Sequence, residues 1–345
     1  MSVQEALDEL QYGGPEIRVR AALELSRLAD PVALPPLIAA LDDNEPEVRA
    51  AAAEALAPFR PRQAVAKLIP LLQDRSWLVR EAAATTLGII GDPSSSRALL
   101  ELVERGYARD VTSQRHHQTI MEGTIALGRI KDPRSTPVLI KLMKKGYLNA
   151  VSDWQLQLRQ AAALGLGYLD QPAGVEALLN ILNEGEQREV RETAITALSM
   201  VRSDESFKIL IAALNNRLFE NSRSSWPRLQ GAITALGQMD NPKAVPYLLP
   251  LVDNEAAEVR MALARALTRL GGNESKEVLL KLLRDRMAEV RAAAAQALGH
   301  LQISEASGAL NVVLRDPNRQ VAGAAQVALD QIKALPPGNP DTPKA

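Results

Sequence analysis

A short sequence pattern returns ten times along this chain, with a period of about 31 residues. Its core is the dipeptide Val-Arg, in most copies followed by a Leu eight residues after the Val. The clear copies are Val19-Arg20, Val48-Arg49, Val79-Arg80, Val190-Arg191, Val259-Arg260 and Val290-Arg291. Degenerate copies are Leu158-Arg159 and Val321-Ala322, and two more are traced only through Leu127 and Leu236. Such a period is typical of a solenoid, in which each repeat packs only on its neighbours.

Each repeat reads as a pair of helices, here called A and B. In the copy that begins at Asp74, apolar residues recur at i, i+3, i+4 and i+7 from about Trp77 to Ile90, which predicts a B helix. Gly91 suits the end of that helix, and Pro93 suits the first turn of the following A helix. The sequence therefore predicts an all-α fold: a right-handed α-solenoid of about ten helical hairpins, as a single array over residues 1–333.

Composition narrows the classes of function. Lys and Arg number 40 against 41 Asp and Glu, so the chain lacks the basic balance expected of a nucleic-acid-binding protein. It has no cysteine, which excludes disulfides and thiolate metal sites. No apolar run is long enough to span a membrane. We expect a cytoplasmic protein with a Pro-rich disordered tail at residues 334–345.

The Arg residues that follow the Val of each repeat form the first set of candidate functional residues. An Asp stands five residues before the Val in several copies, as Asp43, Asp74, Asp285 and Asp316. This pattern predicts a structural ladder, in which Arg–Asp hydrogen bonds join the A–B turn of one repeat to the next. A basic stripe for an anionic ligand is the alternative. The ladder residues are Arg20, Arg49, Arg80, Arg159, Arg191, Arg260 and Arg291.

Three repeats are longer than the others by seven to nine residues, and the extra residues always fall between helix A and helix B. These insertions are residues 106–118, 146–155 and 215–227. Five of the eleven aromatic residues lie in them, with two of the three histidines. Insertions at one position of a solenoid project from one edge and often bind. Their aromatic and histidine residues are Tyr107, His116, His117, Tyr147, Trp154, Phe219 and Trp226.

Three interpretations of these insertions stay open: anchors for a protein partner, a site for a small flat ligand, or side chains that fold back on the solenoid. The second candidate surface is the face lined by B helices. Met121 and Gln160 stand two residues after the repeat position and are expected to face a partner there. Gly128, Gly167 and Gly237 are expected to line a groove that admits a partner helix closely.

No catalytic or metal-binding constellation emerges from the residues. Adjacent His116 and His117 point in different directions on a helix, so we expect them to bind no metal ion together. No Ser/His/Asp set can be assembled from three histidines. The sequence therefore predicts a binding protein, with its enzyme status undecided.

The repeat itself resembles a known type. The segment from Asp74 to Pro93, D-x-x-x-x-V-R-x-x-A-x-x-x-L-G-x-I-G-D-P, is similar to the HEAT-like repeat first associated with phycobiliprotein lyases. The likeness extends over residues 3–333 and is specific for the fold rather than for a function. HEAT-type deoxyhypusine hydroxylases carry His-Glu pairs for two irons, and this chain has no such pair.

The resemblance implies a HEAT-repeat scaffold that holds a protein partner, in assembly or maturation of antenna or cofactor proteins. The partner could be a phycobiliprotein subunit or a second HEAT-repeat chain. The alternative is a bilin lyase or bilin chaperone of the E/F type, with the bilin as a transient ligand and no resident cofactor. Such lyases need no cysteine of their own.

Overall fold

A computed structural model describes residues 1–108, 114–144, 153–182, 187–214 and 226–334. These ranges contain α-helices and 3-10 helices and no β-strand, so the predicted all-α solenoid is confirmed. The chain divides into two compact units, Met1–Leu178 with Gln187–Ala197, and Leu179–Glu186 with Leu198–Ala345. The expected tail at 334–345 lies outside the described residues from 335 onward.

Helices of type A and type B alternate along the first unit, and the last residues of its final helix pair belong to the second unit. The A helices are α1 (Val3–Tyr12), α3 (Leu34–Ala40), α5 (Val65–Leu71), α7 (Ser96–Ala108), α9 (Thr136–Lys144) and α11 (Pro172–Ile181). The B helices are α2 (Pro15–Leu28), α4 (Pro46–Leu56), α6 (Trp77–Ile90), α8 (Gln114–Arg129), α10 (Asp153–Leu169) and α12 (Arg188–Leu198).

The second unit continues the alternation. Its A helices are α13 (Asp204–Leu214), α15 (Val245–Leu248), α17 (Asn273–Leu282) and α19 (Ser307–Val313). Its B helices are α14 (Trp226–Gln238), α16 (Ala257–Leu270), α18 (Ala288–His300) and α20 (Arg319–Lys333). Short 3-10 helices are η1 (Pro31–Ala33), η2 (Ala57–Phe59), η3 (Arg62–Ala64), η4 (Pro93–Ser95), η5 (Pro133–Ser135), η8 (Pro242–Ala244), η9 (Leu249–Asp253) and η10 (Ser304–Ala306).

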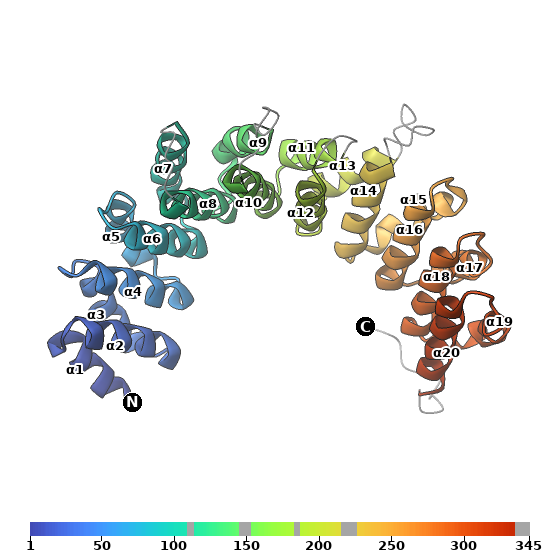
Figure 1. Cartoon of the computed structure of the whole chain (residues 1–345), viewed down its shortest axis with the longest axis horizontal. Coiled ribbons are helices and arrows are strands. Elements are labelled where there is room, and N and C mark those ends of the chain that lie inside the picture. The colour runs from blue at the N-terminus through green and yellow to red at the C-terminus, as the bar shows by residue number, and fades with distance from the viewer. Residues whose placement is uncertain (109–113, 145–152, 183–186, 215–225, 335–345) are drawn as a thin grey trace. The chain divides into compact units, whose positions relative to one another are not determined.

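Within each unit the B helices stack on one another and each A helix packs on its own B helix (Figure 1). The buried side of this two-layer stack is filled by the Leu that ends each repeat pattern. Leu56, Leu87 and Leu127 in the first unit, and Leu267 and Leu298 in the second, are fully buried. Each such side chain contributes about 2 kcal/mol from burial, so the spacing of the pattern is the spacing of the core.

The turns from B to A helices follow from a few residues. Gly91 ends α6 in the left-handed conformation with φ of 73°. The side chain of Asp92 then accepts a hydrogen bond from the Ser94 backbone N–H at 2.9 Å, and Pro93 begins a 3-10 turn before α7. The A helix therefore starts one turn later than the proline alone predicts, because the Asp side chain and the proline together favour the tighter 3-10 geometry.

Candidate functional site

The three insertions lie between α7 and α8, α9 and α10, and α13 and α14. Tyr147 and Phe219 fall outside the described residues, and so do the side chains of Tyr107 and His116. The last residues of each insertion are described, because they form the start of a B helix. The contacts of these residues define the base of the first two insertions.

His117 and Trp154 form that base. Their rings stack with centroids 4.2 Å apart and planes 7° from parallel. His117 is buried and belongs to the first turn of α8, while Trp154 is half-buried in the first turn of α10. The two side chains thus join the starts of neighbouring B helices, which places His117 inside the molecule rather than at an exposed contact surface.

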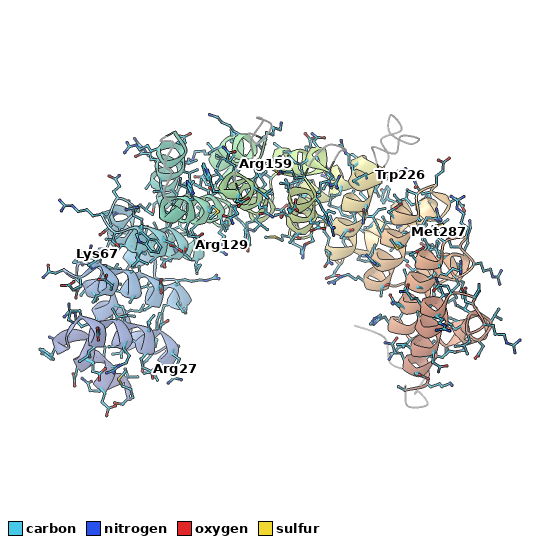
Figure 2. The ribbon with its side chains drawn as sticks, viewed as in Figure 1. Arg27, Lys67, Arg129, Arg159, Trp226 and Met287 are labelled. Atoms are coloured by element: carbon cyan, nitrogen blue, oxygen red, sulfur yellow. The ribbon has the colours of Figure 1, made fainter. Side chains whose placement is uncertain are left out.

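Arg159 secures the other end of the second insertion. Its Nε donates to the carbonyl oxygen of Met143 at 2.7 Å, and its side chain is 3% exposed. Because Met143 lies in the last turn of α9, this bond satisfies a helix-terminal carbonyl that no residue of the helix can reach. Figure 2 shows Arg159 on α10 and Trp226 at the start of α14, where the third insertion ends.

The B-helix face of the first unit is polar, and side-chain hydrogen bonds join its neighbouring helices. Thr85 Oγ1 of α6 donates to Glu122 Oε2 of α8 at 3.2 Å, and Gln118 Nε2 donates to Glu122 Oε1 at 3.3 Å. Gln160 Nε2 of α10 donates to Thr193 Oγ1 of α12 at 3.2 Å. Met121 lies half-buried on the same helix as Glu122.

This face also carries acids that have no basic partner among the described residues. Burial raises the pKa of Glu81, and the charges of Glu122 and Glu54 raise it further. Burial alone raises the pKa of Glu54. A raised carboxyl pKa means that the ionised form is disfavoured here, so the B-helix face between α4 and α8 favours a cationic neighbour.

The glycines predicted to line an open groove lie elsewhere, and that expectation is wrong. Gly128, Gly167 and Gly237 are buried where one B helix touches the next. A Cβ on Gly128 would stand 2.2 Å from the carbonyl oxygen of Gly165, and one on Gly167 would stand 2.6 Å from that of Ala197. Small residues are needed at these positions because B helices approach closely side by side, so the glycines serve the stack rather than a partner.

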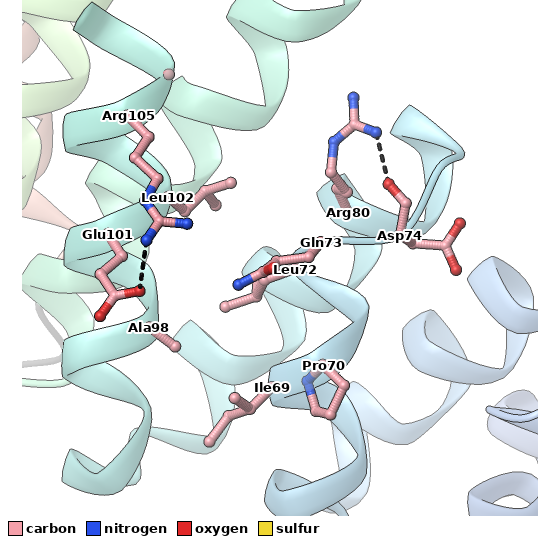
Figure 3. A pocket seen from close by; sticks show the side chains of 11 residues that line it. Ile69, Pro70, Leu72, Gln73, Asp74, Arg80, Ala98, Glu101, Leu102 and Arg105 are labelled. Carbon is pink, nitrogen blue, oxygen red and sulfur yellow. Dashed lines mark hydrogen bonds and ion pairs between the residues drawn. The ribbon is translucent and has the colours of Figure 1, made fainter.

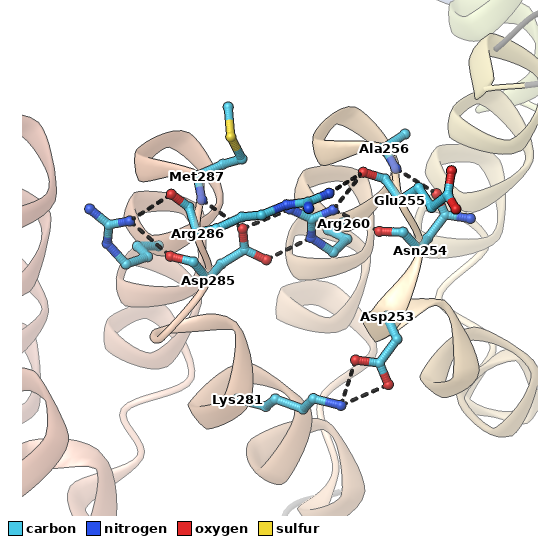
Figure 4. A network of polar contacts seen from close by, with 10 residues as sticks. Asp253, Asn254, Glu255, Ala256, Arg260, Lys281, Asp285, Arg286 and Met287 are labelled. Carbon is cyan, nitrogen blue, oxygen red and sulfur yellow. Dashed lines mark hydrogen bonds and ion pairs between the residues drawn. The ribbon is translucent and has the colours of Figure 1, made fainter.

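Among the described residues, the Arg–Asp ladder has three complete rungs, in which one guanidinium binds both oxygens of an Asp 25 residues later. The Nε and Nη2 atoms meet the carboxylate at 3.0 and 3.1 Å for Arg49–Asp74, 2.6 and 2.7 Å for Arg260–Asp285, and 2.7 and 2.9 Å for Arg291–Asp316. In each rung Nη1 donates to two carbonyl oxygens of its own A–B turn. Figure 4 shows the Arg260 rung.

Burial and hydrogen bonding act in opposite senses on these carboxylates. Burial alone would raise the pKa of Asp285, but hydrogen bonds from Arg260 and from the Met287 backbone N–H bring it below its ordinary value. The hydrogen bonds from Arg291 likewise lower the pKa of Asp316. Both acids are therefore ionised, and each ties one A–B turn to the next hairpin.

Arg20 is not a rung, contrary to the sequence prediction. It pairs with Glu9 at 2.9 Å and is largely exposed. Arg18 takes the place in the ladder, with Nη2 bound to Asp43 at 2.8 Å and Nη1 bound to the Gly13 carbonyl oxygen at 2.9 Å. The signal was present in the sequence: Asp43 stands 25 residues after Arg18, and the buried Leu25 stands eight residues after Ile17.

Two other predicted rungs, at Arg159 and Arg80, also differ, and the rung predicted at Arg191 stays a prediction. Arg159 binds the end of α9, as described above. The position 25 residues after Arg191 lies outside the described residues. Arg80 keeps only its bonds to the carbonyl oxygens of Asp74 and Arg75, at 2.8 and 3.1 Å, and has no carboxylate partner among the described residues.

Two kinds of feature are absent from the described residues. No group of three or more His, Asp or Glu side chains in these ranges is placed to hold a metal ion. No helix among them combines the length and the apolar character needed to cross a bilayer.

The chain is similar to several solved structures, and the Kap121p structure supports the fold. The chain is 16% identical to Kap121p bound to Nup53p, with a TM-score of 0.53, and the match covers 96% of this chain and 41% of Kap121p. The complex of CpcE and CpcF of phycocyanin lyase from Nostoc sp. PCC7120 is 23% identical over 77% of this chain and 94% of that one, with a TM-score of 0.46. An engineered protein is 20% identical, with a TM-score of 0.40, and the match covers 97% of this chain and 100% of the engineered one.

Sequence comparisons give the family. No curated protein sequence matches the chain. The family model for HEAT repeats matches residues 3–57, 34–117, 147–225 and 218–299. Because these matches cover more than half of the chain, the chain belongs to the HEAT-repeat family.

Proposed function

We propose that this chain is a binding scaffold that holds a protein partner against its B-helix face and its three insertions. The proposed setting is the assembly or maturation of antenna or cofactor proteins, which rests on the resemblance of the repeat at residues 74–93 to that of phycobiliprotein lyases. The solenoid fold suits this role, since Kap121p, a structure of the same fold, holds Nup53p.

The stack of His117 on Trp154 is the observation that carries the proposal. Loops bind well when a rigid scaffold positions them, because less conformational freedom is then lost on binding. The stack fixes the starts of α8 and α10 to each other, and the Arg159 bond fixes the end of α9. Two insertions rich in aromatic residues thus arise from one braced part of the first unit.

The charge of the B-helix face supports a protein partner with basic residues. Glu54, Glu81 and Glu122 lie close enough for their charges to raise the pKa of Glu81. A Lys or Arg of a partner placed there relieves this repulsion. Complementary charge of this kind mainly sets the rate and specificity of association.

The test is capture of partners by the full chain and by two matched double variants. Tyr107→Ala with Tyr147→Ala changes the first two insertions. Tyr12→Ala with Tyr247→Ala removes the same side chains from outside the insertions, where Tyr12 is 77% and Tyr247 46% exposed. Bound proteins are identified by mass spectrometry, and circular dichroism checks that helicity is unchanged.

We expect the insertion variant to lose capture by about tenfold or more, as for loss of interface hot spots, and the control variant to keep it. Equal capture by both variants would overturn the role of the insertions. An absorbance scan of the captured material addresses the alternative function. A bilin band that disappears in the insertion variant would favour a bilin lyase or bilin chaperone of the E/F type over a colourless scaffold.

A further inference from the structure

The ladder has an incomplete rung at Arg80. In the complete rungs, each guanidinium has two occupied sides: Nη1 binds the carbonyl oxygens of its own turn, and the Nε–Nη2 side binds an Asp carboxylate. Arg80 has the first side in place, through Asp74 and Arg75. The residue that stands 25 positions after Arg80 is Arg105, which belongs to α7 and not to a turn. No carboxylate of the described residues therefore stands where the next rung would have one.

One donor on the second side of the Arg80 guanidinium lacks a partner. Its Nε is buried without a hydrogen-bond partner among the described residues. Burial lowers the pKa of the Arg80 guanidinium, although the nearby charge of Asp74 raises it. A buried donor without a partner is destabilising, so this side of Arg80 favours an acceptor that fits two parallel N–H groups.

A cavity of about 450 Å³ lies beside Arg80 in the first unit. Arg80 and Arg105 lie on opposite sides of it, with Gln73 between them, as Figure 3 shows. Leu72, Ala98 and Leu102 give it apolar walls. The Arg105 side chain is 66% exposed, and its Nη2 atom lies 3.6 Å from Glu101 Oε2, which is a long distance for an ion pair. The Arg105 guanidinium can therefore turn toward a second acid. The pocket thus combines two cations with apolar walls. Its lining also holds two acids that already have basic partners: Asp74 binds Arg49, and Glu101 pairs with Arg97 and Arg105.

We propose that this Arg80 pocket binds an Asp side chain of a partner protein, within a segment whose acid is preceded by apolar residues. The inference rests on the proposed function as a protein-binding scaffold. The chain's own rungs show the chemistry that fits: Asp74 follows Leu71-Leu72-Gln73, and Asp285 follows Leu282-Leu283-Arg284. A partner segment of the same kind completes the rung from another molecule, with its apolar residue on Leu72 and Leu102.

A polypeptide fits this pocket better than a free carboxylate ion. A bidentate carboxylate occupies only the region beside the Nε–Nη2 edge, whereas the cavity extends to α7 and its apolar walls. Apolar contact there adds binding that an ion cannot obtain. The partner's acid also meets a second cation, Arg105.

The experiment uses the full chain labelled with ¹⁵N at the arginine Nε atoms. The probe is the peptide acetyl-Leu-Leu-Arg-Asp-amide, which copies the sequence of residues 282–285. Acetyl-Leu-Leu-Arg-Asn-amide tests the need for a carboxylate, and sodium acetate tests a free ion. The Nε–H signal of Arg80 is assigned from its loss in Arg80→Lys. We expect the Asp peptide to shift that signal, at a concentration about tenfold or more below that needed with acetate.

Matched variants locate the binding. Arg80→Lys keeps the charge but loses the two-donor edge, so the peptide should bind about tenfold more weakly. Arg105→Gln should weaken it about threefold. Arg97→Gln is the control, because Arg97 pairs with the same Glu101 from one helical turn earlier in α7 but does not line the pocket. If Arg80→Lys folds poorly, Arg105→Gln and the Asn peptide still decide the question.

Several results would overturn the proposal: no shift of the Arg80 signal, an equal response to the Asn peptide, or equal potency of acetate. Binding that appears only in Asp110→Asn would show that the chain's own Asp110 fills the rung. The proposal of the Arg80 pocket and the proposed scaffold function can be refuted independently of each other. Partner capture that depends on the insertions but survives Arg80→Lys, with no peptide binding, refutes the pocket alone.

Discussion

At the scale of single residues, the Arg–Asp rungs differ from other ion pairs of the chain in how far they are shielded from water. The side chains of Arg260 and Asp285 are 5% and 9% exposed, whereas those of Lys281 and Asp253, also drawn in Figure 4, are 57% and 73% exposed. A buried charge that loses its partner is strongly destabilising, and an exposed pair contributes little. The two pairs join the same two hairpins, so they form a matched comparison.

Arg260→Ala is expected to lower the free energy of unfolding by about 3 kcal/mol, because Asp285 is left buried and two turn carbonyls lose their donor. Lys281→Ala should lower it by less than about 1 kcal/mol. Urea unfolding followed by circular dichroism measures both. Similar losses for the two variants would mean that the rung has no special role in stability.

Asp132 gives a prediction on pH. Hydrogen bonds from Arg134 lower the pKa of this buried carboxyl from 3.8 to about 2. Since the folded pKa lies below the unfolded one, the stabilisation is present above about pH 4 and is lost as the pH falls toward 2. Asp132→Asn should lower the free energy of unfolding at pH 7 by about 1–2 kcal/mol, a value limited by solvent screening of the exposed Arg134.

The preceding B–A turn provides the control for Asp132. Asp92 makes the same bond to the backbone N–H two residues on, but Ser94 stands where Arg134 stands. Asp92→Asn should therefore change stability by less than half as much. Denaturant unfolding at pH 7, 4 and 2 checks the prediction, and a difference between wild type and Asp132→Asn that persists at pH 2 would refute it.

At the scale of elements, the closeness of neighbouring B helices depends on single glycines. Gly128 of α8 faces the backbone of Gly165 of α10, whereas Gly323 of α20 has nothing within 4 Å of an added Cβ. Gly128→Ala forces α8 and α10 apart and should destabilise the chain by about 3 kcal/mol. Gly323→Ala should stabilise it by about 0.5–1 kcal/mol, since alanine favours the helix.

Thermal unfolding of the two variants, with helicity as the signal, decides this prediction. A lower midpoint for Gly128→Ala and a slightly higher one for Gly323→Ala are expected. If both substitutions raise the midpoint, the close contact of α8 with α10 does not require a glycine at position 128, and the prediction is wrong.

The elements themselves could be predicted from the sequence because one repeat specifies one hairpin. The helix expected at Trp77–Ile90 has those limits in the structure. The sequence predicts the first repeat two residues late, at Val19-Arg20, because the Val-Arg dipeptide there lies beside the true rung at Arg18, whose preceding Ile17 stands eight residues before the buried Leu25. The groove glycines were misplaced for a physical reason: a small residue marks close approach, and the sequence does not say whether a partner or the next helix approaches.

The candidate site could be predicted less well than the fold. The insertions follow from irregular spacing, and their aromatic content is visible in the sequence. The stack of His117 on Trp154 joins residues of different repeats, so no local pattern reveals it. The Arg80 pocket arises from a missing Asp, which becomes visible only when the three complete rungs show the 25-residue spacing.

At the scale of the whole molecule, stability is spread over local contacts. The main helix–helix contacts join elements close in sequence, such as α6 with α8 and α16 with α18. In such an array, stability is approximately a sum of the hairpins and their neighbouring interfaces. Damage at one rung should therefore remain near that rung, and one free energy of unfolding need not describe the whole chain.

Hydrogen exchange of the native chain tests this locality. Arg260→Ala should speed exchange by about tenfold or more in α16, α17 and α18, because each 1.4 kcal/mol lost there is a tenfold rise in local opening. Exchange in α2, α4 and α6 should stay unchanged. Arg49→Ala removes the equivalent rung from the first unit and should give the reverse pattern. An equal rise throughout the chain in either variant would show one cooperative block, and the nearest-neighbour account of this solenoid would then be wrong.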